Sequence, residues 1–197
     1  MELITKRLLL REFAEGDLPA LVAYQADPRY VEFWPVEAPP DQTRHLFDLF
    51  RRWADERPRR NYQVAVARLQ SPHELIGNCG IRGQGLEDGA AEFGLELAPQ
   101  WWGHGYATEA ARAILGFGFR ELELREVRGL SVTENTRLTR MVPGLGFTRL
   151  GTRPGPAWMQ ARGWSQTEWR LGREQWEASQ GAEPGTAADG GRNAGLS

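Results

Sequence analysis

The stretch Gln100-Trp-Trp-Gly-His-Gly-Tyr-Ala-Thr-Glu-Ala110 carries the residues whose types and spacing point most directly to chemistry. Gly103 and Gly105 lack side chains, so a ligand can approach the backbone N–H groups around them. Apolar residues at three- and four-residue steps follow and predict a helix over 106–119. The first turn of a helix offers free N–H donors and the positive end of the helix dipole. The stretch therefore predicts an anion site suited to a pyrophosphate.

Several classes of cofactor site use a glycine turn of this kind, and the flanking residues must discriminate between them. The P-loop string G-x-x-x-x-G-K-S/T does not occur in the chain. A dinucleotide fingerprint has a small residue at its third glycine position, where counting from Gly103 and Gly105 places Thr108. The two glycines alone do not determine which class of cofactor the turn binds.

The elements around the turn follow from periodicity. Apolar and polar residues alternate over 91–97, which predicts a strand directly before the turn. A strand predicted over 127–132 would lie parallel to it, joined by a right-handed β-α-β crossover. We also predict helices over 17–24 and 41–57 with a loop over 28–40 between them, and strands over 62–69, 75–82, 147–152 and 167–171.

Composition indicates one globular domain. The chain has 197 residues, of which 41% are hydrophobic and 25% charged, values that argue against disorder and against a membrane span. The longest aliphatic run, Leu8 to Leu10, is too short for a signal peptide or an anchor. A net charge of −2 gives no electrostatic footprint for nucleic acid. The single cysteine, Cys79, cannot form an internal disulfide, so we expect a small apolar strand residue and a cytoplasmic protein.

The glycine stretch resembles the CoA-binding signature Q/R-x-x-G-x-G/A of the GNAT superfamily of N-acetyltransferases. Gln100, Gly103 and Gly105 match it literally. In a second register, Trp102 to Ala107 match the W-G-x-G-Y-A-x-E-A version typical of the RimJ/RimL-type branch. We prefer this register because it continues through Ala110. The cofactor-binding residues that the resemblance implies are Phe93, Leu95, Leu97, Gln100, Trp102, Gly103, His104, Gly105, Tyr106, Ala107 and Asn135.

The resemblance covers roughly residues 3–176 in order. Thr5 to Arg11 is similar to the first strand of the branch, T-x-R-L-x-L-R, and Ile76 to Gly80 is similar to its I-G-x-x-G strand. Asn135 and Leu145 to Phe147 resemble the N…L-G-F segment. The resemblance implies a single α/β domain of the GNAT type over 1–178. Its mixed, mostly antiparallel central sheet would be flanked by helices around a β-α-β acyl-CoA-binding core.

The residues that would move protons are only partly recognisable. In the resembling family the pantetheine arm pairs with the motif strand, here Phe93 to Leu97. Glu92 and Glu96 lie on one face of that strand, roughly 13 Å apart. The resemblance favours Glu92 as the general base with Glu96 as the other candidate, and two solvent-facing carboxylates are the alternative interpretation. Asn135 is implied to bind the pantetheine amide, and an N-cap is the alternative for it.

The general acid that reprotonates the CoA thiolate has no recognisable residue. Leu138 occupies the serine position of the branch, and Pro143-Gly144 replace its E-K pair. The family's late tyrosine is absent, and Thr136 and Thr139 point elsewhere on a helix. A thiolate with a pKa near ~8.5 can also leave with the help of solvent. A noncatalytic acyl-CoA-binding module is therefore an alternative to an enzyme.

We expect an acetyl-CoA-dependent N-acetyltransferase acting on an amine, with a protein N-terminal α-amine as the leading acceptor and a small-molecule amine as the alternative. A ribosomal-protein N-terminus is one such acceptor, and the expected protein is a monomer or homodimer that binds neither nucleic acid nor membrane. Scattered histidines and the lack of an H-E-x-x-H string predict no metal site. Residues 179–197 predict a disordered tail. The candidates for the wall of an acceptor cleft, against ordinary packing, are Trp34, Trp158 and Trp164.

Overall fold

A computed structural model describes residues 1–35 and 41–180 of the chain. Over these residues the strands form one eight-stranded sheet in the order β1-β2-β3-β4-β5-β6-β8-β7. Neighbouring strands pair antiparallel except β5 and β6, which pair parallel. This is the expected mixed, mostly antiparallel sheet. The strands are β1 (Glu2–Ile4), β2 (Leu8–Arg11), β3 (Asn61–Arg68), β4 (Ser71–Arg82), β5 (Ala90–Leu97), β6 (Glu126–Val132), β7 (Thr148–Pro154) and β8 (Ser165–Gly172).

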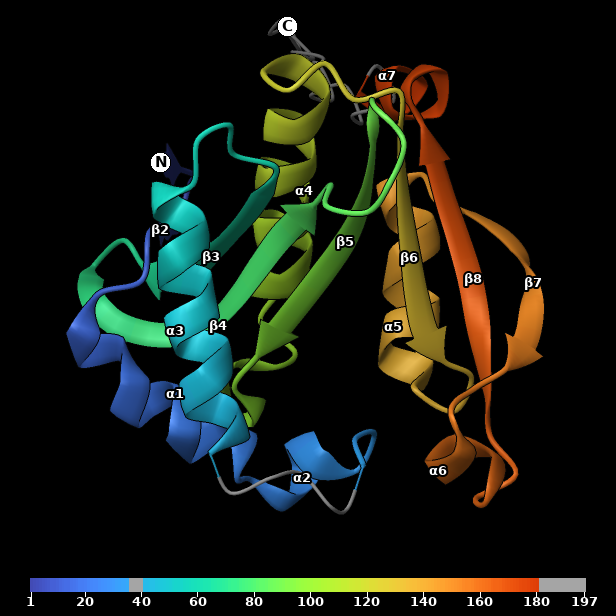
Figure 1. Cartoon of the computed structure of the whole chain (residues 1–197), viewed down its shortest axis with the longest axis horizontal. Helices are drawn as coiled ribbons and strands as arrows, with labels where there is room; N and C mark the ends of the chain where they lie inside the picture. The colour runs from blue at the N-terminus through green and yellow to red at the C-terminus, as the bar shows by residue number, and fades with distance from the viewer. Residues whose placement is uncertain (36–40, 181–197) are drawn as a thin grey trace, which may run out of the picture.

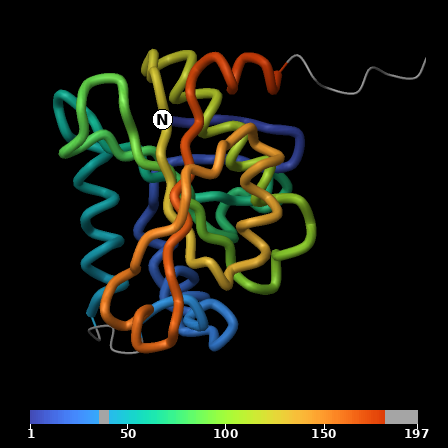
Figure 2. The backbone as a smooth tube through the Cα atoms, turned by 90° about the vertical axis from the view of Figure 1, so that its right-hand side faces the viewer, coloured from blue at the N-terminus to red at the C-terminus, as the bar shows by residue number. Residues whose placement is uncertain are grey.

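Helices cover both faces of the sheet (Figures 1 and 2). Helices α1 and α3 pack on β3 and β4 from one side, while α4 packs on β2, β4 and β5 from the other. The helices are α1 (Leu18–Gln25), α2 (Pro28–Val31), α3 (Gln42–Asp55), α4 (Tyr106–Arg120), α5 (Thr136–Met141), α6 (Ala157–Gln160) and α7 (Arg173–Gln180), with 3-10 turns η1 (Glu15–Asp17), η2 (Pro99–Trp101) and η3 (Val142–Leu145).

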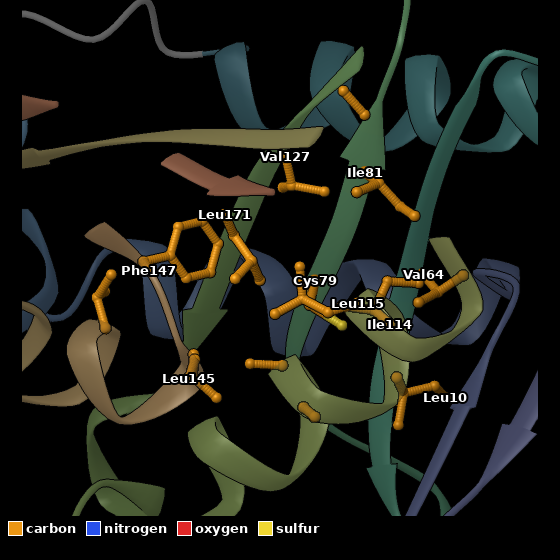
Figure 3. Packing of buried hydrophobic residues seen from close by; sticks show 14 of the residues in the cluster. Leu10, Val64, Cys79, Ile81, Ile114, Leu115, Val127, Leu145, Phe147 and Leu171 are labelled. Carbon is orange, nitrogen blue, oxygen red and sulfur yellow. The ribbon is translucent and has the colours of Figure 1, made fainter. Parts of the chain in front are cut away.

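The main hydrophobic core lies between the sheet and α4 (Figure 3). Ile114 and Leu115 of α4 pack there with Val64 and Ile81 of the strands, and all four side chains are buried. Burying an aliphatic side chain of this size contributes about 1.5–3 kcal/mol. A methyl group at Gly118 would lie 2.7 Å from a carbon of Ile81, so the missing side chain lets α4 approach the sheet closely. The close packing holds α4 against the sheet.

Strands β5 and β6 pair at only one end, and this opening positions the site. Their pairing runs from Ala90 with Glu126 to Glu92 with Arg128. Beyond that point the two strands diverge (Figure 1), while β5 stays paired to β4 and β6 to β8. The edge of β5 from Phe93 to Leu97 therefore faces an opening in the sheet.

Most of the predicted elements are present, including the helix over 106–119 and the parallel strands that flank it. Cys79 is a fully buried strand residue, as expected. No helix in the described part of the chain is both long and apolar enough to span a membrane.

Two local predictions were wrong, and the boundary of a third differs by two residues. Thr5 to Arg7 is a turn between β1 and β2, because the Thr5 N–H donates to the Leu8 carbonyl at 2.9 Å. The predicted loop over 28–40 contains α2, which Asp27 caps by accepting from the N–H of Arg29 at 2.9 Å; residues 36–40 lie outside the described residues. The tail predicted over 179–197 begins with two residues that still belong to α7, and 181–197 lie outside the described residues.

Candidate active site

A cleft of about 890 Å³ occupies the opening between β5 and β6. The glycine turn and the start of α4 line one end of the cleft, and α5 lines the side toward β6. Residues of α2, α3 and α6 surround the other end. The cleft therefore joins the predicted anion site to a separate compartment across the sheet.

The glycine turn has the geometry of an anion site. Gly103 and Gly105 have φ angles of 81° and 79°, in the left-handed region that favours glycine. Gly105 is the N-cap of α4, and no side chain caps that helix. The first intrahelical bond runs from the N–H of Glu109 to the Gly105 carbonyl, which leaves the N–H groups of 106–108 without an intrahelical acceptor. These donors and the helix dipole suit a pyrophosphate.

A carboxylate holds the turn against the N-terminal strands. Glu109 accepts from the Thr5 hydroxyl at 2.6 Å and from the Arg7 backbone N–H at 2.8 Å. The Arg7 guanidinium contacts the other carboxylate oxygen at 2.7 Å and also donates to the His104 carbonyl at 3.0 Å. Burial alone would raise the pKa of Glu109, but the hydrogen bonds from Thr5 and Arg7 outweigh it and lower the pKa. The segment that begins at Thr5 and the glycine stretch, which both resemble the family, thus meet in one ion-paired cluster.

The wall opposite the turn comes from the start of α5. Asn135 lines the cleft, and its Oδ1 accepts from the Leu138 N–H at 3.2 Å, so the side chain is an N-cap. The Arg137 guanidinium lies over the Trp102 ring at 4.1 Å, which links α5 to the glycine turn across the opening. Leu138 lines the cleft at the serine position, while the Thr139 hydroxyl is engaged with the Asn135 carbonyl at 2.8 Å.

One buried hydroxyl does line the cleft. Ser131 of β6 is 6% exposed, and its Oγ accepts from the Trp169 indole N–H at 2.8 Å. Accepting this bond leaves the hydroxyl proton available to a ligand. No sequence pattern points to this residue, because a lone serine in a strand has no periodic or motif context.

The two predicted carboxylates lie on the same sheet face and line the cleft, but their surroundings differ. Glu92 is 52% exposed and accepts from the Arg82 guanidinium at 2.9 Å. The Glu96 Oε2 accepts from three donors at 3.0–3.2 Å, and these are Tyr24, Gln25 and Asn78. Burial, and then the charge of Glu96, raise the pKa of Tyr24 well above its usual range, so that hydroxyl stays protonated.

Aromatic side chains surround the end of the cleft near Glu96. Tyr30 and Trp34 stack with ring centroids 5.7 Å apart, and both line the cleft together with Trp158. Trp164 does not line it and packs on Phe33 at 5.8 Å. At this end of the cleft, the described aromatic side chains therefore form a largely apolar wall around the hydrogen-bonded carboxylate of Glu96.

The cleft brings together most of the predicted site residues. Gln100, His104 and Trp164 lie outside its lining, and the remaining predicted residues form part of it. Within the described residues, no group of His, Cys, Asp or Glu is arranged to hold a metal ion. The site residues that the sequence analysis missed are Tyr24, Gln25, Tyr30, Asn78, Arg82, Ser131 and Arg137.

Comparisons with known proteins agree on one family. The sequence model of the GNAT acetyltransferase domain matches residues 7–148. An uncharacterized N-acetyltransferase of Bacillus licheniformis is 28% identical over 151 residues, which cover 76% of this chain and 83% of that protein. A GNAT-family acetyltransferase structure from Bacillus anthracis superposes with a TM-score of 0.71 at 24% identity, covering 88% of this chain and 99% of that one. A spermidine N-acetyltransferase of Vibrio cholerae, solved with CoA and spermine, gives the same TM-score and coverage at 18% identity.

Proposed function

This chain belongs to the GNAT family of acetyltransferases and is an acetyl-CoA-dependent N-acetyltransferase; from that premise we propose that its acceptor is a protein N-terminal α-amine, as in the RimJ/RimL-type branch. The observation that carries the proposal is the apolar compartment around Glu96. A terminal amine is one positive charge attached to a peptide, so one carboxylate and a nonpolar wall suit it. Its pKa of ~7.7–8.0 also lets a modest base deprotonate it near neutral pH.

The charges around the cleft argue against a polyamine, the acceptor class that the Vibrio cholerae neighbour suggests. A polyamine carries several positive charges and needs several free carboxylates. Among the described residues, the acids that line the cleft are Glu92 and Glu96, and Glu92 is already paired with Arg82. Three further arginines line the cleft, and one of them, Arg29, is paired with Asp27. Those arginines are Arg29, Arg137 and Arg140.

The cofactor end of the cleft supports a division of roles. We assign the pyrophosphate to the free N–H groups at the start of α4, with the Arg137 guanidinium beside Trp102 as an additional cation. The edge of β5 from Phe93 to Leu97 offers backbone groups to the pantetheine arm. The side chain of Asn135 uses Oδ1 for capping, and its amide N–H groups remain for the pantetheine.

We assign the general base to Glu96 and not to Glu92, the residue that the resemblance favours. The Glu92 carboxylate is already paired with the Arg82 guanidinium, and the Glu92 side chain is half exposed to solvent. In Glu96 the three donors Tyr24, Gln25 and Asn78 all engage Oε2, so Oε1 is the oxygen that none of them reaches, and the Tyr30 hydroxyl is a further neighbour of this carboxylate. A free carboxylate oxygen in the cleft can accept the proton of the amine, directly or through a water. We place the protein in the cytoplasm, where acetyl-CoA and nascent N-termini are available.

The acceptor is tested by release of free CoA thiol from acetyl-CoA with a panel of amines. The panel contains peptides that start with Ala or Ser, including a ribosomal-protein N-terminus, and the same peptides with a blocked N-terminus as controls. Spermidine and a small aromatic amine complete it. We expect turnover with free peptides, a shift of 42 Da at the first residue by mass spectrometry, and little turnover with spermidine. Turnover with spermidine alone would refute the peptide acceptor.

A further inference from the structure

A chain of hydrogen bonds connects the two cleft carboxylates through the middle of the sheet. The Asn78 side-chain amide donates to the Tyr24 hydroxyl at 2.7 Å and to Glu96 Oε2 at 3.0 Å. Its Oδ1 accepts from Gln63 Nε2 at 2.5 Å, and Gln63 Oε1 accepts from Arg82 at 2.9 Å. Asn78 is therefore the branch point between Glu96 and the rest of the chain.

The burial of this network shows that it is specified and not incidental. Asn78 is 1% exposed and Gln63 is 2% exposed, and they lie in the sheet face that packs against α1 and α3. Leaving a buried donor or acceptor unpaired costs about 1–3 kcal/mol. Every side-chain polar atom of Asn78 is engaged, and both of its N–H bonds point toward α1 and β5. Its rotamer, and with it the direction of Glu96, is fixed by its partners.

We propose that Asn78 and Tyr24 are positioning residues that hold Oε2 of Glu96 so that Oε1 receives the proton of the acceptor amine. This inference rests on the proposed role of Glu96 as the base. As the amine nitrogen attacks the thioester carbonyl, the C–N bond forms and the C–S bond breaks. The electron pair of that bond leaves on sulfur, and the nitrogen proton passes to Oε1 of Glu96. Neither positioning residue takes up the proton.

The groups that face Glu96 from the neighbouring elements are neutral hydrogen-bonding side chains. Helix α1 contributes the Tyr24 hydroxyl and the Gln25 amide, and strand β4 contributes Asn78. Helix α2 contributes Tyr30, whose pKa is raised by burial and then by the charge of Glu96. The nearest full charges along the network are Arg82, two hydrogen bonds beyond Asn78, and its partner Glu92, one bond further. Neutral donors that stay protonated therefore surround the base.

The test is the pH profile of kcat/KM for the best amine of the panel, measured for the wild type and four variants. Asn78→Asp places a second carboxylate against Glu96, and like charges disfavour ionisation. The acidic limb of the profile, where kcat/KM falls with decreasing pH, should move to higher pH by about one unit or more. The KM for acetyl-CoA should change less than about twofold. Tyr24→Phe removes one donor at nearly constant shape and should move the limb in the same direction by less. The ionisation of the amine is common to all variants, so differences between profiles report the enzyme.

The matched control is Asn61→Asp. Asn61 is also 1% exposed in the sheet, but it bonds to Gln84 and does not line the cleft. This variant should lose thermal stability without moving the acidic limb. If Asn78→Asp does not fold, Tyr24→Phe decides. An unmoved limb in the folded variants, with activity still lost in Glu96→Gln, would overturn the positioning role alone. Full activity in Glu96→Gln would instead refute the proposed base.

Discussion

Replacing Glu109 by Gln tests whether this carboxylate anchors the glycine turn to the N-terminal strands. The carboxylate is 17% exposed and receives hydrogen bonds from Thr5 and from two groups of Arg7. A hydrogen bond to a charged group contributes about 1.5–3 kcal/mol. The neutral amide keeps weaker versions of two bonds and turns a donor toward the guanidinium. Because Arg7 is 42% exposed, we expect a net loss of about 2 kcal/mol.

Thermal unfolding with and without acetyl-CoA measures this loss. For a chain of this size, about 2 kcal/mol lowers the Tm by about 4–8 °C. The pKa of Glu109 is lowered from 4.5, so its contribution is complete above that pH and disappears as the pH falls through the folded-state pKa. The difference between wild type and variant should therefore persist at pH 7 and shrink in acid. Glu168→Gln, which breaks an exposed pair with Arg153, is the control. Equal effects of the two substitutions would refute the anchoring role.

Two further predictions concern the cofactor end of the cleft. Acetyl-CoA at about 100 times its Kd should stabilise the fold by about 2.7 kcal/mol, with much smaller effects of NADH and ATP. Gly105→Val should abolish that stabilisation because a branched side chain disfavours the φ of 79° and blocks the approach of the cofactor to the backbone. An unchanged thermal shift in the variant would contradict the assignment of the turn. Asn135→Ala should raise the KM for acetyl-CoA besides lowering the Tm by loss of the cap; a lower Tm at unchanged KM would show that capping is its only role.

Local patterns were sufficient to predict the part of the site that is continuous in sequence. The strand before the glycine turn, the helix after it and the parallel strand beyond are neighbours along the chain, and each has a clear period. The helix start at Asp27 and Pro28 was missed because α2 has a single turn and no apolar period. The turn at Thr5 was assigned to a strand on the resemblance alone, since three polar residues in a row, Thr5 to Arg7, show no alternating period.

Contacts across the chain were beyond the reach of those patterns. Glu109 meets Arg7 from 102 residues away, and Glu96 meets Tyr24 from 72. Such pairs depend on how the sheet places its strands, which no local period reports. For this reason the sequence favoured Glu92 on its distance from the motif, whereas the hydrogen-bond partners of each carboxylate favour Glu96.

The measurement that tests the central claim most directly compares Glu96→Gln with Glu92→Gln in steady-state acetyl transfer to the best amine. If Glu96 takes the amine proton, its substitution should lower kcat by about 10²–10⁴-fold, or by the lower end of that range with a water relay. The KM for acetyl-CoA should stay unchanged. Glu92→Gln should retain activity within a few fold, since its carboxylate is already paired with Arg82. A large loss of kcat in Glu92→Gln with an active Glu96→Gln would contradict the account.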